Sequence, residues 1–156
     1  MIVSEFQRSQ VNEVMALIKE IIPHGPNPTF YWPEDLLKAE LWDAEGFVCK
    51  NANQIIGVLI YRTLAFHAFE ISLIASHPLF TGQGVGALLL QKLQNQCTND
   101  QAIWLEVHPA NVKAIRLYEK LGFHKTGLRP RYYRDGSEAI LYSWRPHHSE
   151  ALSESD

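Results

Sequence analysis

The stretch Gly82-Gln83-Gly84-Val85-Gly86-Ala87 is the part of this sequence that says most about its fold. It follows a strand candidate and leads directly into an apolar helix candidate that contains Leu88, Leu89, Leu90 and Leu93. Glycine adopts positive φ angles at no steric cost and lets the backbone approach a ligand closely. The free N–H groups at the start of the following helix form a site for an anion, and phosphate is the natural ligand.

Three interpretations of this stretch are open on its residues alone. It can be a tight turn into the helix without a ligand. It can belong to a dinucleotide-binding fold, because Gly82-x-Gly84-x-x-Ala87 fits the loose form of that fingerprint and Glu106 could contact a ribose. It can also hold the pyrophosphate of coenzyme A. The second interpretation is weakened because at least three strand candidates precede the glycines and residues 77–81 separate them from the last one.

The sequence around the glycines predicts seven strands and four helices. Hydrophobic spacing and turn residues place them in the order strand, two helices, three strands, helix, strand, helix, two strands. Ser9 stands at an N-cap position, Pro33 at a first helical position and Gly122 at a helix C-terminus. This order predicts an α/β (α+β) domain with a mixed, mostly antiparallel sheet. The predicted strands are residues 2–6, 46–50, 55–64, 68–75, 102–107, 123–128 and 139–144, and the helices are 9–22, 33–42, 84–96 and 111–121.

Composition narrows the class of protein. The 156 residues are enough for one domain with a core, and we expect that domain to span residues 1–146, followed by a polar, disordered tail at 147–156. Two cysteines form no disulfide framework, which favours a reduced, cytoplasmic setting. The net charge of −3 argues against direct binding to nucleic acid. We expect no membrane partner, because no apolar run approaches a bilayer span, and no metal site, because no histidines stand at ligand spacing outside the tail.

A second motif starts at Asn111. Residues 111–123 have the pattern Asn-x-x-Ala-x-x-Leu-Tyr-x-x-x-Gly-Phe, and they follow the glycine stretch in the order seen in one known family. Over about residues 1–145 the chain resembles the GNAT superfamily of N-acetyltransferases, which use acetyl-CoA. It is most similar there to the bacterial ribosomal-protein-alanine N-acetyltransferases. The closer likeness lies in Phe30-x-Trp32, Ile74-Ala75, Leu105-Glu106-Val107, and Arg129 to Tyr133 with Asp135-Gly136.

The resemblance implies two catalytic residues. Glu106 would be the general base for the acceptor amine, and Tyr118 would protonate the leaving thiolate. A carboxylate can accept the proton of an amine directly or through one water. A phenol with a pKa of about 10 can protonate a thiolate whose thiol has a pKa of about 8.5. The alternatives are an ordinary strand-surface acid for Glu106 and a core tyrosine for Tyr118, whose ring can pack while its hydroxyl reacts.

The resemblance also implies how acetyl-CoA, the cosubstrate, would bind. Its pyrophosphate would lie on Gly82, Gln83, Gly84, Val85, Gly86 and Ala87, and backbone groups of Ile74, Ala75 and Ser76 would pair with its pantetheine arm. Asn111 would contact coenzyme A in addition to capping its helix. Thr81 departs from the family, which usually has Gln or Arg at this first position of the loop, so a cationic contact is missing there.

The acceptor is predicted less specifically. Residues 24–32 and 129–134 are candidate walls of its site, although Phe30, Tyr31 and Trp32 could instead hold the second helix to the core. We favour the N-terminal α-amine of a protein, possibly a ribosomal protein, with the enzyme a monomer or weak dimer. A small-molecule amine, an internal lysine and a non-enzymatic acetyl-CoA sensor stay open as alternatives. His77 and His108 could line the mouth of the cleft, but we favour an exposed loop position for each.

Overall fold

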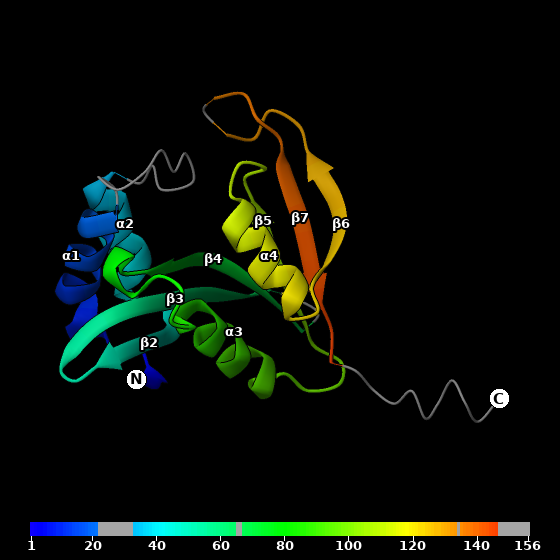
Figure 1. The fold of residues 1–156 in the computed structure, drawn as a ribbon. Coiled ribbons are helices and arrows are strands. Elements are labelled where there is room, and N and C mark those ends of the chain that lie inside the picture. Colours follow the sequence, from blue (N-terminus) through cyan, green and yellow to red (C-terminus); the bar gives the residue numbers. More distant parts are fainter. Residues whose placement is uncertain (22–32, 65–66, 134, 147–156) are drawn as a thin grey trace.

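The computed structural model describes residues 1–21, 33–64, 67–133 and 135–146, so the predicted acceptor segment 24–32 and the predicted tail 147–156 lie outside the described residues. The element order of the described part is the predicted one (Figure 1). Its elements are β1 (Ile2–Glu5), α1 (Val11–Ile21), α2 (Glu34–Trp42), β2 (Glu45–Asn51), β3 (Gln54–Leu64), β4 (Ala68–Ser76), α3 (Val85–Gln96), β5 (Ala102–Val107), α4 (Val112–Lys120), β6 (His124–Arg129) and β7 (Ala139–Trp144), with short 3₁₀ turns η1 (Arg8–Gln10) and η4 (Pro78–Phe80).

The strands form one mixed sheet, as the sequence predicts. Its order is β1-β2-β3-β4-β5-β7-β6, and β4 with β5 is the parallel pair while the other five pairs are antiparallel. A dinucleotide-binding fold needs a mostly parallel sheet built from successive βαβ units. The topology therefore removes that interpretation of the glycine stretch.

Helices cover both faces of the sheet, and each face has its own core. On one face α1 and α2 pack through side chains such as Val14, Ile18 and Leu41 onto the sheet residues Val58 and Ile60. On the other face α3 and α4 lie together, and they pack through Leu89, Leu90, Leu93 and Tyr118 onto Ile103 and Leu105 (Figure 1). Successive side chains of a strand point to opposite faces, so apolar residues on both sides of a strand bury it between two helical layers.

The sheet opens in its middle, between β4 and β5. These strands pair at Ala68↔Ala102, Phe69↔Ile103 and Glu70↔Trp104 and no further. Beyond that point β4 continues along β3 to Ser76, while β5 follows β7 up to the pair Val107↔Ile140. Figure 1 shows β4 and β5 leaving their common start in different directions. The facing edges of both strands are therefore free of a neighbouring strand over their C-terminal parts.

Two helix starts differ from the prediction. Ser9 lies inside η1 instead of capping α1, which starts at Val11, and the Gln7 N–H donates to Gln10 Oε1 at 2.8 Å. Pro33 lies one residue before α2, and its carbonyl accepts the Leu37 N–H at 2.9 Å. A 3₁₀ turn and a preceding carbonyl satisfy the first helical donors here, which a cap pattern in the sequence does not reveal. Among the described residues no helix is long and apolar enough to cross a bilayer.

Gly57 of β3 allows α3 to rest on the sheet. A Cβ atom at this position would lie 2.4 Å from Val85 Cγ1, where α3 begins. We therefore expect Gly57→Ala to lower the free energy of unfolding by about 1–3 kcal/mol through overpacking. We also expect it to raise the KM for the acetyl-CoA that the family resemblance implies, because the displaced turn belongs to the glycine stretch. Urea denaturation and steady-state kinetics measure the two effects.

Gly127→Ala is the matched control for this substitution. A Cβ atom there would lie 3.4 Å from Leu141 Cδ1, which is an ordinary contact. We expect this variant to stay within about 0.5 kcal/mol of the wild type. Equal effects of the two substitutions would contradict the packing role of Gly57.

Candidate active site

The glycine stretch forms a loop and the first turn of α3, as predicted. Gly82 and Gly84 both have φ of +82°, and Gly84 is the N-cap residue of α3. A Cβ atom at either position would meet no atom within 4 Å. Backbone conformation is therefore the reason for glycine at both places, since an L side chain is strained in this region wherever it points. Gly86 differs, because a Cβ atom there would lie 2.8 Å from Leu117 Cδ2 of α4.

The start of α3 offers unpaired donors. Leu88 is the first residue whose N–H bonds back into the loop, to the Gly84 carbonyl at 3.0 Å. In the described part of the chain no acceptor pairs with the N–H groups of Val85, Gly86 and Ala87, as the first turn of any helix requires. The Thr81 hydroxyl donates to the Pro78 carbonyl at 2.9 Å, so its proton is used within η4. The donors of this site are thus backbone groups, and they suit a phosphate.

The open edge of β4 provides further backbone groups. His77 N–H donates to the Ile56 carbonyl at 2.7 Å, so the backbone groups of every second residue before His77, such as Ala75, point toward β3. By alternation the backbone groups of Ile74 and Ser76 point the other way, toward the opening between β4 and β5. Ala75 pairs with Val58 of β3 and lies between them. Two of the three predicted residues thus present free backbone groups with which an extended ligand can pair.

Glu106 reaches the opening from β5. Its neighbours Leu105 and Val107 belong to the core beneath α3 and α4, so Glu106 points to the opposite face of the sheet. Its side chain is 18% exposed, and Oε1 lies 3.0 Å from Arg129 Nη1. Interaction with this carboxylate, together with burial, raises the pKa of Tyr132 to about 12. Arg129 at the end of β6 and Tyr132 in the connection to β7 therefore both lie beside Glu106.

Tyr118 approaches the same region from α4, on the other face. It is 4% exposed, and its ring packs on Phe123 and Tyr142 with centroid distances of 5.8 and 6.4 Å. Its hydroxyl has no hydrogen-bond partner in the described part of the chain, where no fully buried side-chain oxygen is left unpaired. Tyr118 therefore offers a hydroxyl that pairs with no described residue, although its ring is buried. Burial raises the pKa of Tyr118, as does the nearby Tyr133, so the phenol keeps its proton.

The ends of α4 fix Tyr118 in place. Asn111 is the N-cap residue, and its Oδ1 accepts the Ala114 N–H at 3.3 Å, as predicted. The Asn111 side-chain amide N–H groups have no partner among the described residues and stay available to a ligand. At the other end Gly122 has φ of +90°, and Phe123 N–H donates to the Tyr118 carbonyl at 3.0 Å, which is the geometry of a glycine helix stop.

Comparison with known proteins decides the family. Residues 12–123 match the sequence profile of the Acetyltransferase (GNAT) family, a range that includes both predicted motifs. The chain belongs to the GNAT family of acetyltransferases. The matched range of this GNAT domain contains the glycine loop, the open edge of β4, Glu106 and Tyr118.

Curated relatives of this GNAT domain include N-terminal acetyltransferases. The chain is 30% identical over 128 residues to the [Ribosomal protein bS18]-alanine N-acetyltransferase of Escherichia coli K12, covering 73% of this chain and 86% of that enzyme. The enzyme of the same name from Haemophilus influenzae is 42% identical over 85 residues, covering 52% and 56%. An uncharacterized protein of Mycobacterium leprae is 36% identical over 125 residues, covering 75% of this chain and 33% of its own length. The match thus spans about half of the Haemophilus influenzae enzyme and a third of the Mycobacterium leprae protein.

Solved structures confirm the fold. The ribosomal-protein-S18-alanine N-acetyltransferase of Escherichia coli superposes with a TM-score of 0.79 at 23% identity, covering 97% of each chain. The acetyltransferase yncA of Salmonella typhimurium, solved with acetyl-CoA, superposes with a TM-score of 0.74 at 16% identity, covering 96% of each chain. The predicted α/β class, with a mixed seven-stranded sheet and four helices, is the GNAT fold.

Sequence reasoning was wrong about two histidines of this GNAT domain. His77 and His108 were expected to be exposed, but they are 7% and 5% exposed. Each follows a strand of the opening, β4 or β5, and each precedes a proline. A histidine before a proline at the end of a strand is the signal that could have suggested a buried, turn-forming role.

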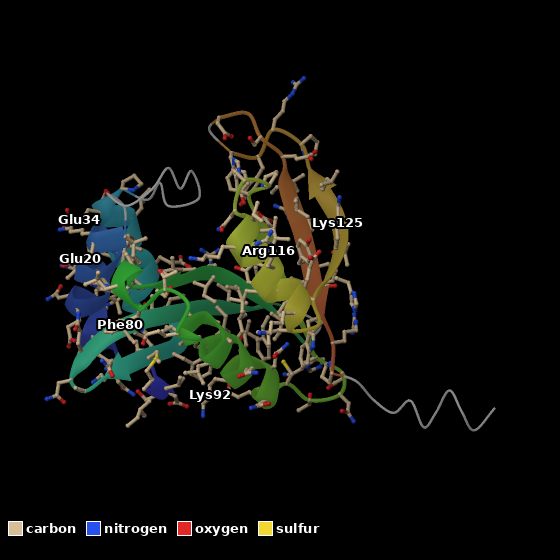
Figure 2. All side chains as sticks on the ribbon, viewed as in Figure 1. Glu20, Glu34, Phe80, Lys92, Arg116 and Lys125 are labelled. Carbon is tan, nitrogen blue, oxygen red and sulfur yellow. The ribbon has the colours of Figure 1, made fainter. Side chains whose placement is uncertain are left out.

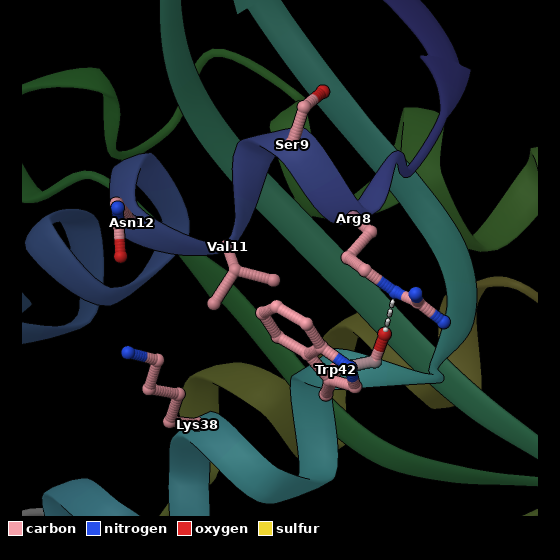
Figure 3. A pocket seen from close by; sticks show the side chains of 6 residues that line it. All are labelled: Arg8, Ser9, Val11, Asn12, Lys38 and Trp42. Atoms are coloured by element: carbon pink, nitrogen blue, oxygen red, sulfur yellow. Dashed lines mark hydrogen bonds between the residues drawn. The ribbon is translucent and has the colours of Figure 1, made fainter.

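Other sites of the GNAT domain are less suited to chemistry. In the described part of the chain no group of three or more His, Cys, Asp or Glu side chains could hold a metal ion, and both cysteines are free thiols. A pocket of about 350 Å³ lies at the start of α1 and the end of α2 (Figure 3). Its Arg8 is already engaged, by the Trp42 carbonyl and by Asp43. The pocket contains no residue of the predicted site and is lined by Arg8, Ser9, Val11, Asn12, Lys38 and Trp42.

Proposed function

We propose that this protein transfers the acetyl group of acetyl-CoA to the N-terminal α-amine of a protein, as its named relatives do for ribosomal protein bS18. The observation that carries the proposal is the opening between β4 and β5, which Glu106 and Tyr118 approach from opposite faces. One side of this opening carries donors suited to a phosphate, and the other carries a carboxylate. A cosubstrate and an acceptor amine can therefore meet there from two sides.

The residues present fit acetyl-CoA, which supplies an activated thioester when bound. The N–H groups of Val85, Gly86 and Ala87 would hold its pyrophosphate at the start of α3. The free backbone groups of Ile74 and Ser76 would pair with its pantetheine arm, and the Asn111 amide would add a donor. These donors are backbone and amide groups without a full charge, and Thr81 adds none.

Two protons have to move in acetyl transfer, and this chain has a group for each. The Glu106 carboxylate would accept the proton of the ammonium group, directly or through one water. The Tyr118 hydroxyl would donate a proton to the departing sulfur, and its raised pKa keeps that proton on the phenol at neutral pH. An α-amine has a pKa of about 7.7–8.0 against about 10.4 for lysine. The α-amine is the acceptor that a carboxylate deprotonates more readily.

The connection between β6 and β7 would form one wall for the acceptor. Arg129 contacts Glu106, and its guanidinium lies 5.8 Å from the centre of the Tyr132 ring. Tyr132 and Tyr133 pack edge to face at 4.9 Å. This wall of aromatic rings beside a carboxylate suits a short peptide end, with one positive charge at its terminus. We further propose that residues 1–146 act as one catalytic domain and that the setting is cytosolic, which agrees with the two free thiols.

A pair of matched peptides tests the proposal. One has a free N-terminal alanine and a dimethylated lysine, and the other has a formylated N-terminus and a free lysine. We expect release of coenzyme A with the first peptide and background release with the second. Turnover of the lysine peptide alone, or of small amines alone, would favour the alternative acceptors; tight acetyl-CoA binding without turnover of any amine would favour a sensor.

A further inference from the structure

The opening between β4 and β5 is flanked by two histidines with the same set of contacts. His77 Nδ1 accepts the Leu79 N–H at 3.1 Å, and its Nε2 lies 3.2 Å from Glu20 Oε2. His108 Nδ1 accepts the Ala110 N–H at 2.9 Å, and its Nε2 lies 2.8 Å from Asp135 Oδ2. Glu20 belongs to the last turn of α1, and Figure 2 shows it on the α1 side of the molecule together with Phe80. Each histidine thus ties the end of a strand beside the opening to an element distant in the sequence.

The proton of His108 can be located from its partners. Nδ1 accepts a backbone N–H, so in the neutral ring the proton is on Nε2 and is donated to Asp135. The ring is 5% exposed, whereas the Asp135 side chain is 45% exposed. A buried ring with both nitrogens paired has one orientation. His108 is therefore a fixed point to which Asp135 attaches.

Asp135 passes this constraint to Ser137, and through it to Tyr132 and Tyr133. Its Oδ1 accepts the Ser137 N–H at 2.8 Å, while Oδ2 accepts the hydrogen bond from His108 Nε2. The Ser137 carbonyl accepts the N–H groups of Tyr132 and Tyr133 at 3.0 and 3.1 Å. His108 also packs directly on the Tyr133 ring, at a centroid distance of 4.8 Å. The two tyrosines are therefore held from both the backbone and the ring side.

Tyr133 links this turn to both predicted catalytic residues. Burial raises the pKa of Tyr133, and the negative charge of Glu106 raises it further. Tyr133 in turn contributes to the raised pKa of Tyr118. Both effects are electrostatic and change with distance. A displacement of the turn would therefore change the surroundings of Glu106 and Tyr118 together.

We propose that His108 is a positioning residue for acetyl transfer: with Asp135 it latches the Tyr132–Tyr133 turn beside Glu106 and so shapes the wall that the acceptor amine meets. The proposal rests on the acceptor side proposed above. It assigns His108 no proton transfer to substrate, because both of its ring nitrogens are already paired.

Two substitutions separate the latch from the turn that His108 also forms. His108→Asn keeps a short side-chain acceptor for the Ala110 N–H but is too short to reach Asp135. His108→Gln is longer and can donate an amide N–H to Asp135. We expect His108→Asn to raise the KM for the acceptor peptide about tenfold or more, the effect of losing a hydrogen bond to a charged group. We expect the KM for acetyl-CoA to stay within about twofold and His108→Gln to recover most of the loss.

A second measurement does not depend on turnover. The amides of Tyr132, Tyr133 and Ser137 report on the turn, since each is hydrogen-bonded within it. We expect them to exchange with deuterium about tenfold faster in His108→Asn and near the wild-type rate in His108→Gln. Asp43→Asn is the control, because Asp43 pairs with Arg8 at the far end of α1, and it should change neither readout.

Three results would overturn the latch. They are unchanged exchange of the turn in His108→Asn, equal increases of both KM values together with a lower melting temperature, and a His108→Gln variant as impaired as His108→Asn. The α-amine proposal fails separately, if the wild-type protein acetylates a different amine. The acceptor KM values of His108→Asn and His108→Gln relative to the wild type, measured with that amine, then test the latch.

Discussion

Replacing Glu106 by Gln is expected to lower kcat for acetyl transfer about 10²–10⁴-fold, which is the usual contribution of a general base. Gln has nearly the same shape and keeps an oxygen beside Arg129, but it cannot take up a proton. The ion pair with Arg129 is partly exposed, so its loss should cost less than about 1 kcal/mol of stability. Steady-state kinetics with a saturating N-terminal alanine peptide measure the effect.

The control for this substitution is Glu13→Gln. Glu13 is an exposed residue in the first turn of α1, and this variant should keep the wild-type kcat. If Glu106→Gln also kept it, Glu106 would be the ordinary surface acid that the sequence left open, and another base would have to be sought. Recovery of activity at high pH, where more of the amine is unprotonated, would support the assigned role.

Replacing Tyr118 by Phe is expected to lower kcat by a similar factor, about 10²–10⁴-fold, while leaving stability almost unchanged. The Tyr118 hydroxyl has no partner among the described residues, so its removal breaks no hydrogen bond with any of them. Because burial raises the pKa of Tyr118 above its ordinary value, the phenol stays protonated through neutral pH. The wild type should therefore lose no activity through this group below a pH of about 10.

Tyr142→Phe is the matched control for Tyr118→Phe. Tyr142 lies in the same aromatic cluster, but its hydroxyl donates to Glu119 Oε2 at 2.9 Å. We expect this variant to lose about 0.5–1.5 kcal/mol of stability and to keep its kcat. The opposite pattern, with activity lost in Tyr142→Phe and kept in Tyr118→Phe, would show that Tyr142 and not Tyr118 supplies the proton.

Much of the fold could be predicted because its signals are local. Helical and strand spacing gave the order of the elements, and alternation along β5 is enough to send Glu106 to the face opposite Leu105 and Val107. The glycines of residues 82–87 predict positive φ angles, and Gly82 and Gly84 have that conformation. Asn111 and Gly122 cap α4 as their residue types suggest.

What could not be predicted depends on contacts between distant residues. The partner of His77 is 57 positions away, and that of His108 is 27 positions away. No spacing rule connects such pairs, so a buried and an exposed histidine look alike in the sequence. The opening between β4 and β5 is likewise a property of the sheet, because it arises where β4 stays with β3 and β5 stays with β7.

The most direct test of the account is a crystal structure with a conjugate that joins coenzyme A, through an acetyl bridge, to the α-amine of an alanine peptide. The account predicts pyrophosphate on the N–H groups of Val85, Gly86 and Ala87, and the pantetheine arm along Ile74 and Ser76. It also predicts the sulfur beside the Tyr118 hydroxyl and the peptide nitrogen on the Glu106 side of the opening. A conjugate whose sulfur lies away from Tyr118, or whose peptide enters away from Glu106 and the Tyr132–Tyr133 turn, would contradict it.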